Sequence, residues 1–165
     1  MIYDFQNLQL RLSSDSDVEF IFELESHKEN FQFITPWSKE RHRLAFLNKD
    51  LVHGIIRDGD KDVGFFILSG VENPNQSIEF MRIVIGPKGS GFGRKSLKAI
   101  KAYCFEQLKT HRIWLDVKTF NHKAQNLYLS EGFVIEGTLR DCIKVEDKFE
   151  SLVVMSILKT EYKNN

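Results

Sequence analysis

The sequence has few cysteines, no net charge and no long apolar run. Its 165 residues include 2 cysteines, Cys104 and Cys142, and 23 acidic residues balance 23 basic ones. Two isolated cysteines exclude a disulfide framework or a cysteine-based zinc site. Balanced charge argues against a nucleic-acid partner, whose phosphates require a surplus of lysine and arginine. No stretch approaches the roughly 20 apolar residues that a membrane helix needs, which argues against a membrane partner.

Length and the first residues set the remaining limits. Soluble domains typically run to about 100–200 residues, so residues 1–165 are expected to form one domain. The N-terminus lacks the basic segment and apolar run of a secretory signal, and no repeat or linker interrupts the chain. We therefore expect a cytoplasmic protein with a single site.

The charges are unevenly distributed along the chain. Residues 87–112 hold seven basic side chains against the single acid Glu106, whereas residues 1–40 hold eight acids against three bases. The basic segment suits an anion and the acidic segment suits a cation, although solvated helix faces produce the same pattern.

Hydrophobic periodicity predicts an α/β fold with a mixed, mostly antiparallel sheet and helices on both faces. Asp58-Gly59-Asp60-Lys61 has the composition of a tight hairpin turn. A helix capped by Ser38 should bury Leu44 and Leu47, and Asn30 to Pro36 should end the helix before it. Strands are expected at 9–12, 51–57, 63–68, 77–85, 113–117, 133–139 and 150–158, and helices near 18–25, 38–48, 97–108 and 123–131.

The strongest chemical signal is a glycine-rich stretch between a predicted strand and a predicted helix. It reads Gly86-Pro87-Lys88-Gly89-Ser90-Gly91-Phe92-Gly93-Arg94. Alternate glycines let several backbone N–H groups approach one ligand, and the helix N-terminus adds positive partial charge, which together suit a pyrophosphate. A P-loop is excluded because Arg94 separates Gly93 from Lys95-Ser96, and a dinucleotide fingerprint is excluded because the glycine spacing differs.

This loop resembles the coenzyme-binding motif Q/R-x-x-G-x-G/A of the GNAT superfamily of N-acetyltransferases. Lys88 stands where that motif has glutamine or arginine. A second segment, Asn121-His122-Lys123-Ala124-Gln125-Asn126-Leu127-Tyr128-Leu129-Ser130-Glu131-Gly132-Phe133, is similar to the family's N-x-x-A-x-x-L-Y-x-x-x-G-F. The resemblance covers about residues 78–137 and is nearest to the branch that acetylates ribosomal-protein N-terminal alanines or small-molecule amines.

The resemblance implies acetyl-CoA as co-substrate and a V-shaped split between two central strands, opened by a bulge near the end of the strand 77–85. The pantetheine arm would lie in the split against backbone of Ile83, Val84 and Ile85, with Asn121 beside it unless Asn121 only caps the next helix. The diphosphate would be held by Lys88, Gly89, Ser90, Gly91, Phe92, Gly93, Arg94 and Lys95.

The implied reaction is direct attack of a primary amine on the thioester in a ternary complex. The resemblance makes Tyr128 the acid that protonates the leaving sulfur and a contact of the coenzyme; the alternative is a tyrosine that only packs. A backbone N–H near Val84 or Ile85 would meet the oxyanion. The amine must first lose a proton, and Glu79, Asp116 or a chain of waters is the candidate base.

The acceptor and the assembly stay open. A small-molecule amine or a peptide N-terminus fits equally, and a non-catalytic acyl-CoA sensor is the alternative function. Trp37, Phe31 and Phe33 either line the acceptor pocket or form core. The five histidines lack metal-ligand spacing, so no metal is expected, and we expect a monomer or a homodimer paired through strand 151–158.

Overall fold

A computed structural model of the chain describes residues 1–163. The described strands form a sheet in the order β1-β2-β3-β4-β5-β6-β8-β7. β5 and β6 pair in parallel, and the other neighbours pair antiparallel, which confirms the predicted mixed, mostly antiparallel sheet. The bounds are β1 Tyr3–Phe5, β2 Leu8–Leu12, β3 Leu51–Asp58, β4 Lys61–Ser69, β5 Ser77–Ile85, β6 Arg112–Lys118, β7 Val134–Val145 and β8 Lys148–Leu158.

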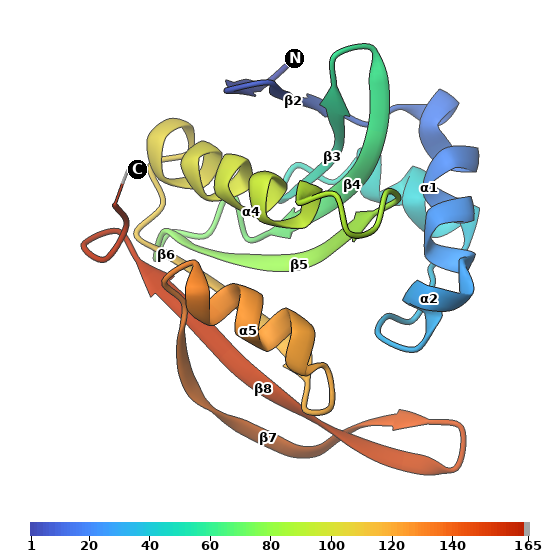
Figure 1. The fold of residues 1–165 in the computed structure, drawn as a ribbon, viewed down its shortest axis with the longest axis vertical. Coiled ribbons are helices and arrows are strands. Elements are labelled where there is room, and N and C mark those ends of the chain that lie inside the picture. The colour runs from blue at the N-terminus through green and yellow to red at the C-terminus, as the bar shows by residue number, and fades with distance from the viewer. Residues whose placement is uncertain (164–165) are drawn as a thin grey trace.

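Helices cover both faces of this sheet, as predicted. The helical elements are the 3-10 turn η1 Asp15–Asp17, α1 Val18–Ser26, α2 Lys28–Phe31, α3 Lys39–Phe46, α4 Phe92–Ala102, the π-helical turn η2 Tyr103–Gln107 and α5 His122–Ser130. α4 packs over one face, and α1 and α2 lie at the side of the sheet where β5 ends (Figure 1). α5 lies beside the long β7–β8 hairpin. None of these described helices is long and apolar enough to cross a membrane.

The core forms two layers because successive strand residues point to opposite faces. Leu97 and Ile100 of α4 pack with Ile113, Leu115 and Val117 of β6 in one cluster. Ile21, Trp37, Ile55, Phe65 and Val84 form the other cluster, under α1 and α3. Along β5 and β6, the side chains that alternate with members of the first cluster therefore point to the opposite face, which α1 covers.

The predicted inner face of α3 is wrong. Leu44 and Leu47 are exposed, and His42 and Ala45 are buried instead. Ser38 does cap the helix, accepting a hydrogen bond from Arg41 N at 3.2 Å. Hydrophobicity misled the prediction because a buried carboxylate from α1 gives the His42 ring a polar partner inside the core.

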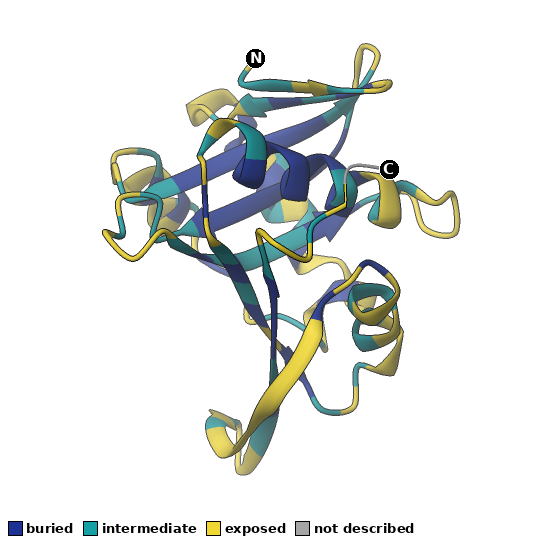
Figure 2. Cartoon of the chain, turned by 90° about the vertical axis from the view of Figure 1, so that its left-hand side faces the viewer, coloured by how far each residue is buried: buried dark blue, intermediate teal, exposed yellow. Residues whose placement is uncertain are grey.

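Two predicted boundaries also change. The segment expected only to end the first helix contains the single-turn helix α2, and the N-terminus adds the short strand β1. β8 lies between β6 and β7, so the expectation that strand 151–158 offers a free edge is wrong. At this end of the sheet the edge strand is β7, which is exposed over most of its length in a hairpin that projects from the body (Figure 2).

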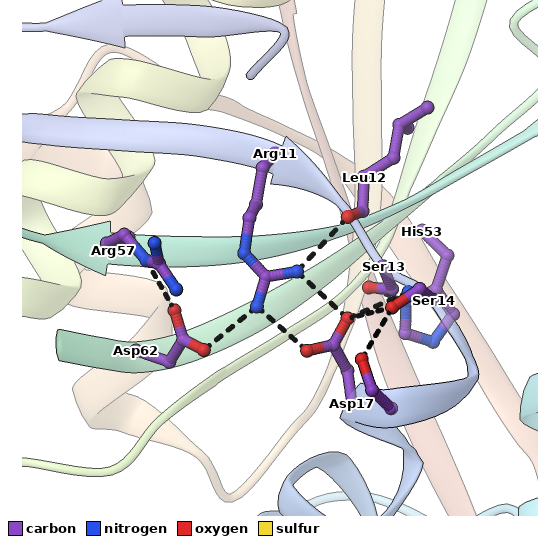
Figure 3. A network of polar contacts seen from close by, with 9 residues as sticks. Arg11, Leu12, Ser13, Ser14, Asp17, His53, Arg57 and Asp62 are labelled. Atoms are coloured by element: carbon purple, nitrogen blue, oxygen red, sulfur yellow. Dashed lines mark hydrogen bonds and ion pairs between the residues drawn. The ribbon is translucent and has the colours of Figure 1, made fainter. Parts of the chain in front are cut away.

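An ion-pair network fixes the N-terminal elements to the sheet. Arg11 of β2 contacts Asp17 of η1 at 2.8 Å and Asp62 of β4 at 2.8 Å, and Asp62 also accepts from Arg57 of β3 at 2.8 Å (Figure 3). Further along the chain, Asp15 pairs with Arg43 at 2.6 Å. Part of the acidic surplus of residues 1–40 is thus neutralised within the fold.

Candidate active site

The sheet opens between β5 and β6. The two strands pair only from Ser77↔Arg112 to Glu79↔Trp114. Beyond these pairs β5 continues to Ile85 along β4, and β6 continues to Lys118 along β8. We call the resulting V-shaped gap in the pairing the split; its vertex lies at Glu79.

A bulge bends β5 at this vertex. Ile67 of β4 lies opposite Arg82, and two residues later Ser69 lies opposite Glu79, so β5 contains one extra residue around Phe80 and Met81. A bulge increases local bend and twist, which separates β5 from β6 where their pairing stops. The prediction of a bulge is confirmed, but its place near the strand end is wrong.

Backbone alternation decides which residues of β5 face the split. Gly86 donates its N–H to Val63 O of β4 at 2.9 Å. Backbone groups of successive residues in an antiparallel pair alternate between the two edges. Ile85 and Ile83 therefore direct their N–H and C=O groups to the split, whereas those of Val84 are directed to β4. Of the predicted residues, Ile83 and Ile85 suit an extended ligand, and of the two predicted oxyanion donors only Ile85 has its N–H on the split side.

The glycine loop joins β5 to the N-terminus of α4. Gly89 has φ +75° and Gly91 has φ +78°, and a Cβ at either position would meet nothing within 4 Å. Glycine is required there by the left-handed backbone, not by lack of space. Lys95 N donates to Gly91 O at 3.2 Å, so the N–H groups of the first turn have no acceptor within the helix. Exposed donors at the start of an 11-residue helix fit a diphosphate.

The loop cations are engaged by other elements. Lys88 Nζ donates to Asn30 Oδ1 of α2 at 2.7 Å, and burial lowers the pKa of Lys88. Arg94 contacts Glu131 Oε1 at 2.5 Å, and the Lys95 ammonium lies 5.8 Å from the Phe92 ring centroid. Ser90 Oγ donates back to Pro87 O at 3.1 Å. The structure thus brings these predicted cofactor residues together around one loop.

Tyr128 and Glu79 each lie within electrostatic reach of Asp116. Burial and then the charge of Asp116 raise the pKa of Tyr128 to about 12. Burial and then Asp116 also raise the pKa of Glu79, and burial raises the pKa of Asp116. The Tyr128 ring packs 5.6 Å from Phe133, and no partner within residues 1–163 hydrogen-bonds its hydroxyl. A protonated phenol and two carboxyls of raised proton affinity can act as acid and base.

Asn121 caps α5, and Glu79 lies on the α1 face of β5. Asn121 Oδ1 accepts from Ala124 N at 3.2 Å, so the helix-cap role is present, and its amide N–H groups stay available. Ile78 and Phe80 belong to the α4 core layer, which places Glu79 on the α1 face. By the same alternation Asp116 and Lys118 share that face. The two carboxyls thus line the side from which an acceptor would approach.

The sequence analysis missed a buried polar network behind this face. Glu25 of α1 has no exposed surface; it pairs with Arg82 of β5, accepts from Trp37 N at 2.8 Å, and lies 3.2 Å from His42 Nε2. Burial alone would raise the pKa of Glu25, but these partners lower it overall. His42 Nδ1 lies 3.0 Å from His53 Nε2, and burial lowers the pKa of His53 to about 3.

A signal for this network was present in the sequence. Glu25 follows Ile21 by one helical turn, on the apolar side of α1, where a carboxylate requires a buried partner. Trp37 is core, with the Arg41 and Arg82 guanidinium groups 4.1 and 4.9 Å from its ring, whereas Phe31 is exposed. In residues 1–163 no cluster of three or more His, Cys, Asp or Glu side chains is arranged around a metal position.

Comparisons with known proteins agree with this geometry. The family model of the acetyltransferase (GNAT) domain matches residues 7–134. The spermidine N(1)-acetyltransferase of Vibrio cholerae is 29% identical over 167 residues, covering 95% of this chain and 96% of its own length. The solved structure of a Vibrio cholerae spermidine N-acetyltransferase in complex with CoA and spermine has a TM-score of 0.84 and 26% identity, covering 94% of this chain and 97% of that one. A dodecameric structure from the same organism has a TM-score of 0.79 and 27% identity, covering 96% and 97%.

Proposed function

The chain belongs to the GNAT acetyltransferase family and is an acetyl-CoA-dependent N-acetyltransferase, and we propose that its acceptor amine is a polyamine such as spermidine or spermine. The observation that carries the acceptor proposal is the pair of carboxyls Glu79 and Asp116 at the vertex of the split, on the α1 face, where Asp116 is close enough to raise the pKa of Glu79. Two neighbouring carboxyls attract an alkylammonium and can remove its proton. The relatives named above support the same class of acceptor.

The coenzyme is proposed to lie in the split, with its diphosphate on the glycine loop. The backbone N–H groups of Gly89, Ser90, Gly91, Phe92 and Gly93 would hold the diphosphate together with Lys88, Arg94 and Lys95. Ile83 and Ile85 would pair with the pantetheine arm as a neighbouring strand does, and Asn121 would donate an amide N–H to it. When bound, acetyl-CoA supplies the thioester that the amine attacks.

Proton transfer falls to three side chains of this chain. An alkylammonium has a reference pKa of about 10.4, so a base must hold its proton at the moment of attack. Glu79, whose pKa is raised, is our first choice, with Asp116 or a bridging water as the alternatives. Tyr128, whose pKa of about 12 keeps it protonated at neutral pH, donates to the leaving sulfur.

The peptide acceptor is the second possibility within the same reaction. The peptide acceptor is supported by the resemblance to the branch that acetylates ribosomal-protein N-termini. The acidic segment 1–40 supports neither acceptor, because Arg11 and Arg43 partly neutralise it. The carboxyl pair at the vertex favours an amine with several positive charges over a peptide N-terminus, which carries a single ammonium charge.

Thiol release from acetyl-CoA tests the proposal. The purified full chain should release thiol with spermidine or spermine at a kcat/KM at least about tenfold above that for a peptide beginning with alanine or for butylamine. Release with the peptide alone would overturn the polyamine acceptor. Tight coenzyme binding with silence for every amine would instead support the non-catalytic sensor.

The β7 edge bears on assembly. Val134, Ile135 and Leu139 of β7 and Phe149 of β8 are exposed apolar side chains. We propose that a second copy covers this hairpin, in a homo-oligomer whose size light scattering will give. A monomer at every protein concentration at which the chain stays in solution would refute this.

A further inference from the structure

Residues 28–33, which comprise α2, Gln32 and Phe33, are held by one lysine from each side of the split. Lys88, in the loop after β5, donates to Asn30 Oδ1 at 2.7 Å. Lys118, the last residue of β6, donates to Gln32 O at 3.0 Å. The two strands diverge beyond Glu79, so this segment joins them again at the open end of the split. We call residues 28–33 the strap.

Both anchors of the strap are built into the fold. Asn30 is 8% exposed, and its Nδ2 donates to Leu24 O of α1 at 2.7 Å, which fixes the amide that receives Lys88. The Lys118 side chain is 9% exposed and pairs with Glu150 of β8 at 2.9 Å. The rings of Phe33 and Phe120 lie 6.1 Å apart at the same junction. Asn30 and Lys118 are thus buried anchors, whereas Lys88 is exposed and is held through its hydrogen bond to Asn30.

The strap touches the proposed sites of both substrates. Lys88 belongs to the loop that would hold the coenzyme diphosphate. Lys118 follows Asp116 by two residues and shares its face of β6, so it lies about 7 Å further along the acceptor side. The strap therefore connects the diphosphate loop on one side to the acceptor wall on the other.

We infer that the strap couples the two substrates energetically, and that Asn30 is a positioning residue for the coenzyme; this inference rests on the proposed function. A lysine ammonium has three N–H donors, and Asn30 uses one of them. The other donors can meet a phosphate while Asn30 holds the ammonium beside the loop. A diphosphate bound to Lys88 then fixes Asn30 and the strap, and the acceptor meets a wall that is already ordered.

Such coupling is reciprocal. If bound coenzyme tightens acceptor binding by some factor, bound acceptor must tighten coenzyme binding by the same factor, typically about 5- to 150-fold. Free coenzyme A carries no acetyl group, so the protein can be titrated with coenzyme A and spermidine together without turnover. Calorimetry can therefore measure the affinity for each of them. The coupling factor is the coenzyme Kd without spermidine divided by the Kd with saturating spermidine.

The Asn30 side is tested by a double-mutant cycle on coenzyme affinity alone. Asn30→Ala and Lys88→Met should each weaken coenzyme A binding by about tenfold, the effect of one charged hydrogen bond, and the double variant should bind no more weakly than Lys88→Met. Additive losses would show that Asn30 does not act through Lys88. This cycle needs no acceptor, so it stands even if the polyamine proposal fails.

The Lys118 side is tested by the coupling factor. Lys118→Met should leave the coenzyme Kd without spermidine within about twofold of wild type while reducing the coupling factor to near one, and Lys118→Arg should restore it because it keeps the charge and donors. Phe120→Leu, at an exposed position, should reduce the factor in part and covers the case in which Lys118→Met does not fold. Lys148→Met, at the exposed hairpin tip, is the control.

The outcomes separate the claims. An unchanged coupling factor in Lys118→Met, or in Phe120→Leu if the first variant unfolds, overturns the inference that the strap couples the two substrates. Absence of coenzyme binding by wild type overturns the proposed function itself. Coenzyme binding without spermidine binding overturns the polyamine acceptor. The double-mutant cycle on Asn30 and Lys88 then decides whether Asn30 positions Lys88 for the coenzyme.

Discussion

At the scale of single residues, the proposed proton transfers use side chains whose proton affinity the fold has changed. Tyr128, Glu79 and Asp116 all have raised pKa values because they are desolvated, and Asp116 adds its charge to the other two. Such shifts gather at functional sites, and here Asp116 is the charge that both other groups share, beside the vertex of the split. Their positions were predicted from motif and strand order, whereas their mutual influence required the fold.

Replacing Tyr128 by phenylalanine removes the proposed acid while keeping the ring against Phe133. A positioned acid contributes about 10²–10⁴ in rate, so kcat with spermidine should fall at least about tenfold. The coenzyme Kd from calorimetry should change less than about threefold. Wild-type turnover in this variant would remove the hydroxyl from the mechanism.

The base is identified by pH dependence. Glu79 must be ionised to accept a proton, so kcat/KM should rise with pH through a value above the usual carboxyl pKa of about 4.3. Glu79→Gln should abolish this acidic limb. If the limb persists there and disappears in Asp116→Asn, Asp116 is the base.

The same shift has a consequence for stability. The folded-state pKa of Glu79 is raised, so its contribution to stability is present at low pH and is lost as the pH rises through that value. Glu79→Gln should therefore melt no lower than wild type at pH 7. This separates lost catalysis from lost folding.

Glu25 is expected to be the most sensitive buried charge. Glu25→Gln leaves the Arg82 guanidinium, 9% exposed, without its counter-ion, and breaking a buried pair typically costs about 3–5 kcal/mol. Denaturant unfolding at pH 7 should show this loss, whereas Glu23→Gln, exposed on α1, should stay within about 0.5 kcal/mol. Equal stabilities would show that the pair is not a net stabiliser.

The pH dependence of that contribution has the opposite sign to that of Glu79. The pKa of Glu25 is lowered on folding, so its stabilisation is present above the unfolded pKa of about 4.3 and is lost as the pH falls. The difference between wild type and Glu25→Gln should therefore shrink below about pH 4.

At the scale of elements, the loop between β5 and α4 is the part most constrained by backbone conformation. Gly91→Ala places a side chain at φ +78°, where strain of about 1 kcal/mol is expected although the space is free. Relaxation of the loop should weaken coenzyme A binding by at least about fivefold. Gly137→Ala, which also meets nothing within 4 Å, should leave binding unchanged. Equal affinities in the two variants would contradict the role of the loop.

Much of the element pattern was predictable from the sequence, for physical reasons. Ser77–Ile85 and the amphipathic α4 have strong periodicity, and their order with the glycine loop is local information. α2 was missed because a helix of four residues has no period to detect, and its contacts with Lys88 and Lys118 come from distant segments. The buried face of α3 was assigned to Leu44 and Leu47 because a His42 ring satisfied by Glu25 cannot be distinguished from a solvated one in sequence.

At the scale of the whole molecule, one parallel pair within an otherwise antiparallel sheet creates the site. The pairing of β5 with β6 stops at Glu79, which leaves backbone of Ile83 and Ile85 without a strand partner on that edge among the described strands. α4 and α5 lie over one face, and α1 with the strap lies at the other (Figure 1). Our proposal assigns the coenzyme to the first side and the acceptor to the second. The sequence could not specify which backbone groups face the split, because that depends on register and on the bulge at Phe80 and Met81.

The central claim is that this split and its glycine loop hold the coenzyme that supplies the acetyl group. Calorimetric titration of acetyl-CoA into the full chain tests it most directly. The account predicts saturable binding at one site per chain, weakened in Gly91→Ala and retained in Tyr128→Phe. No detectable heat and no rise in melting temperature at millimolar acetyl-CoA or free coenzyme A would contradict it.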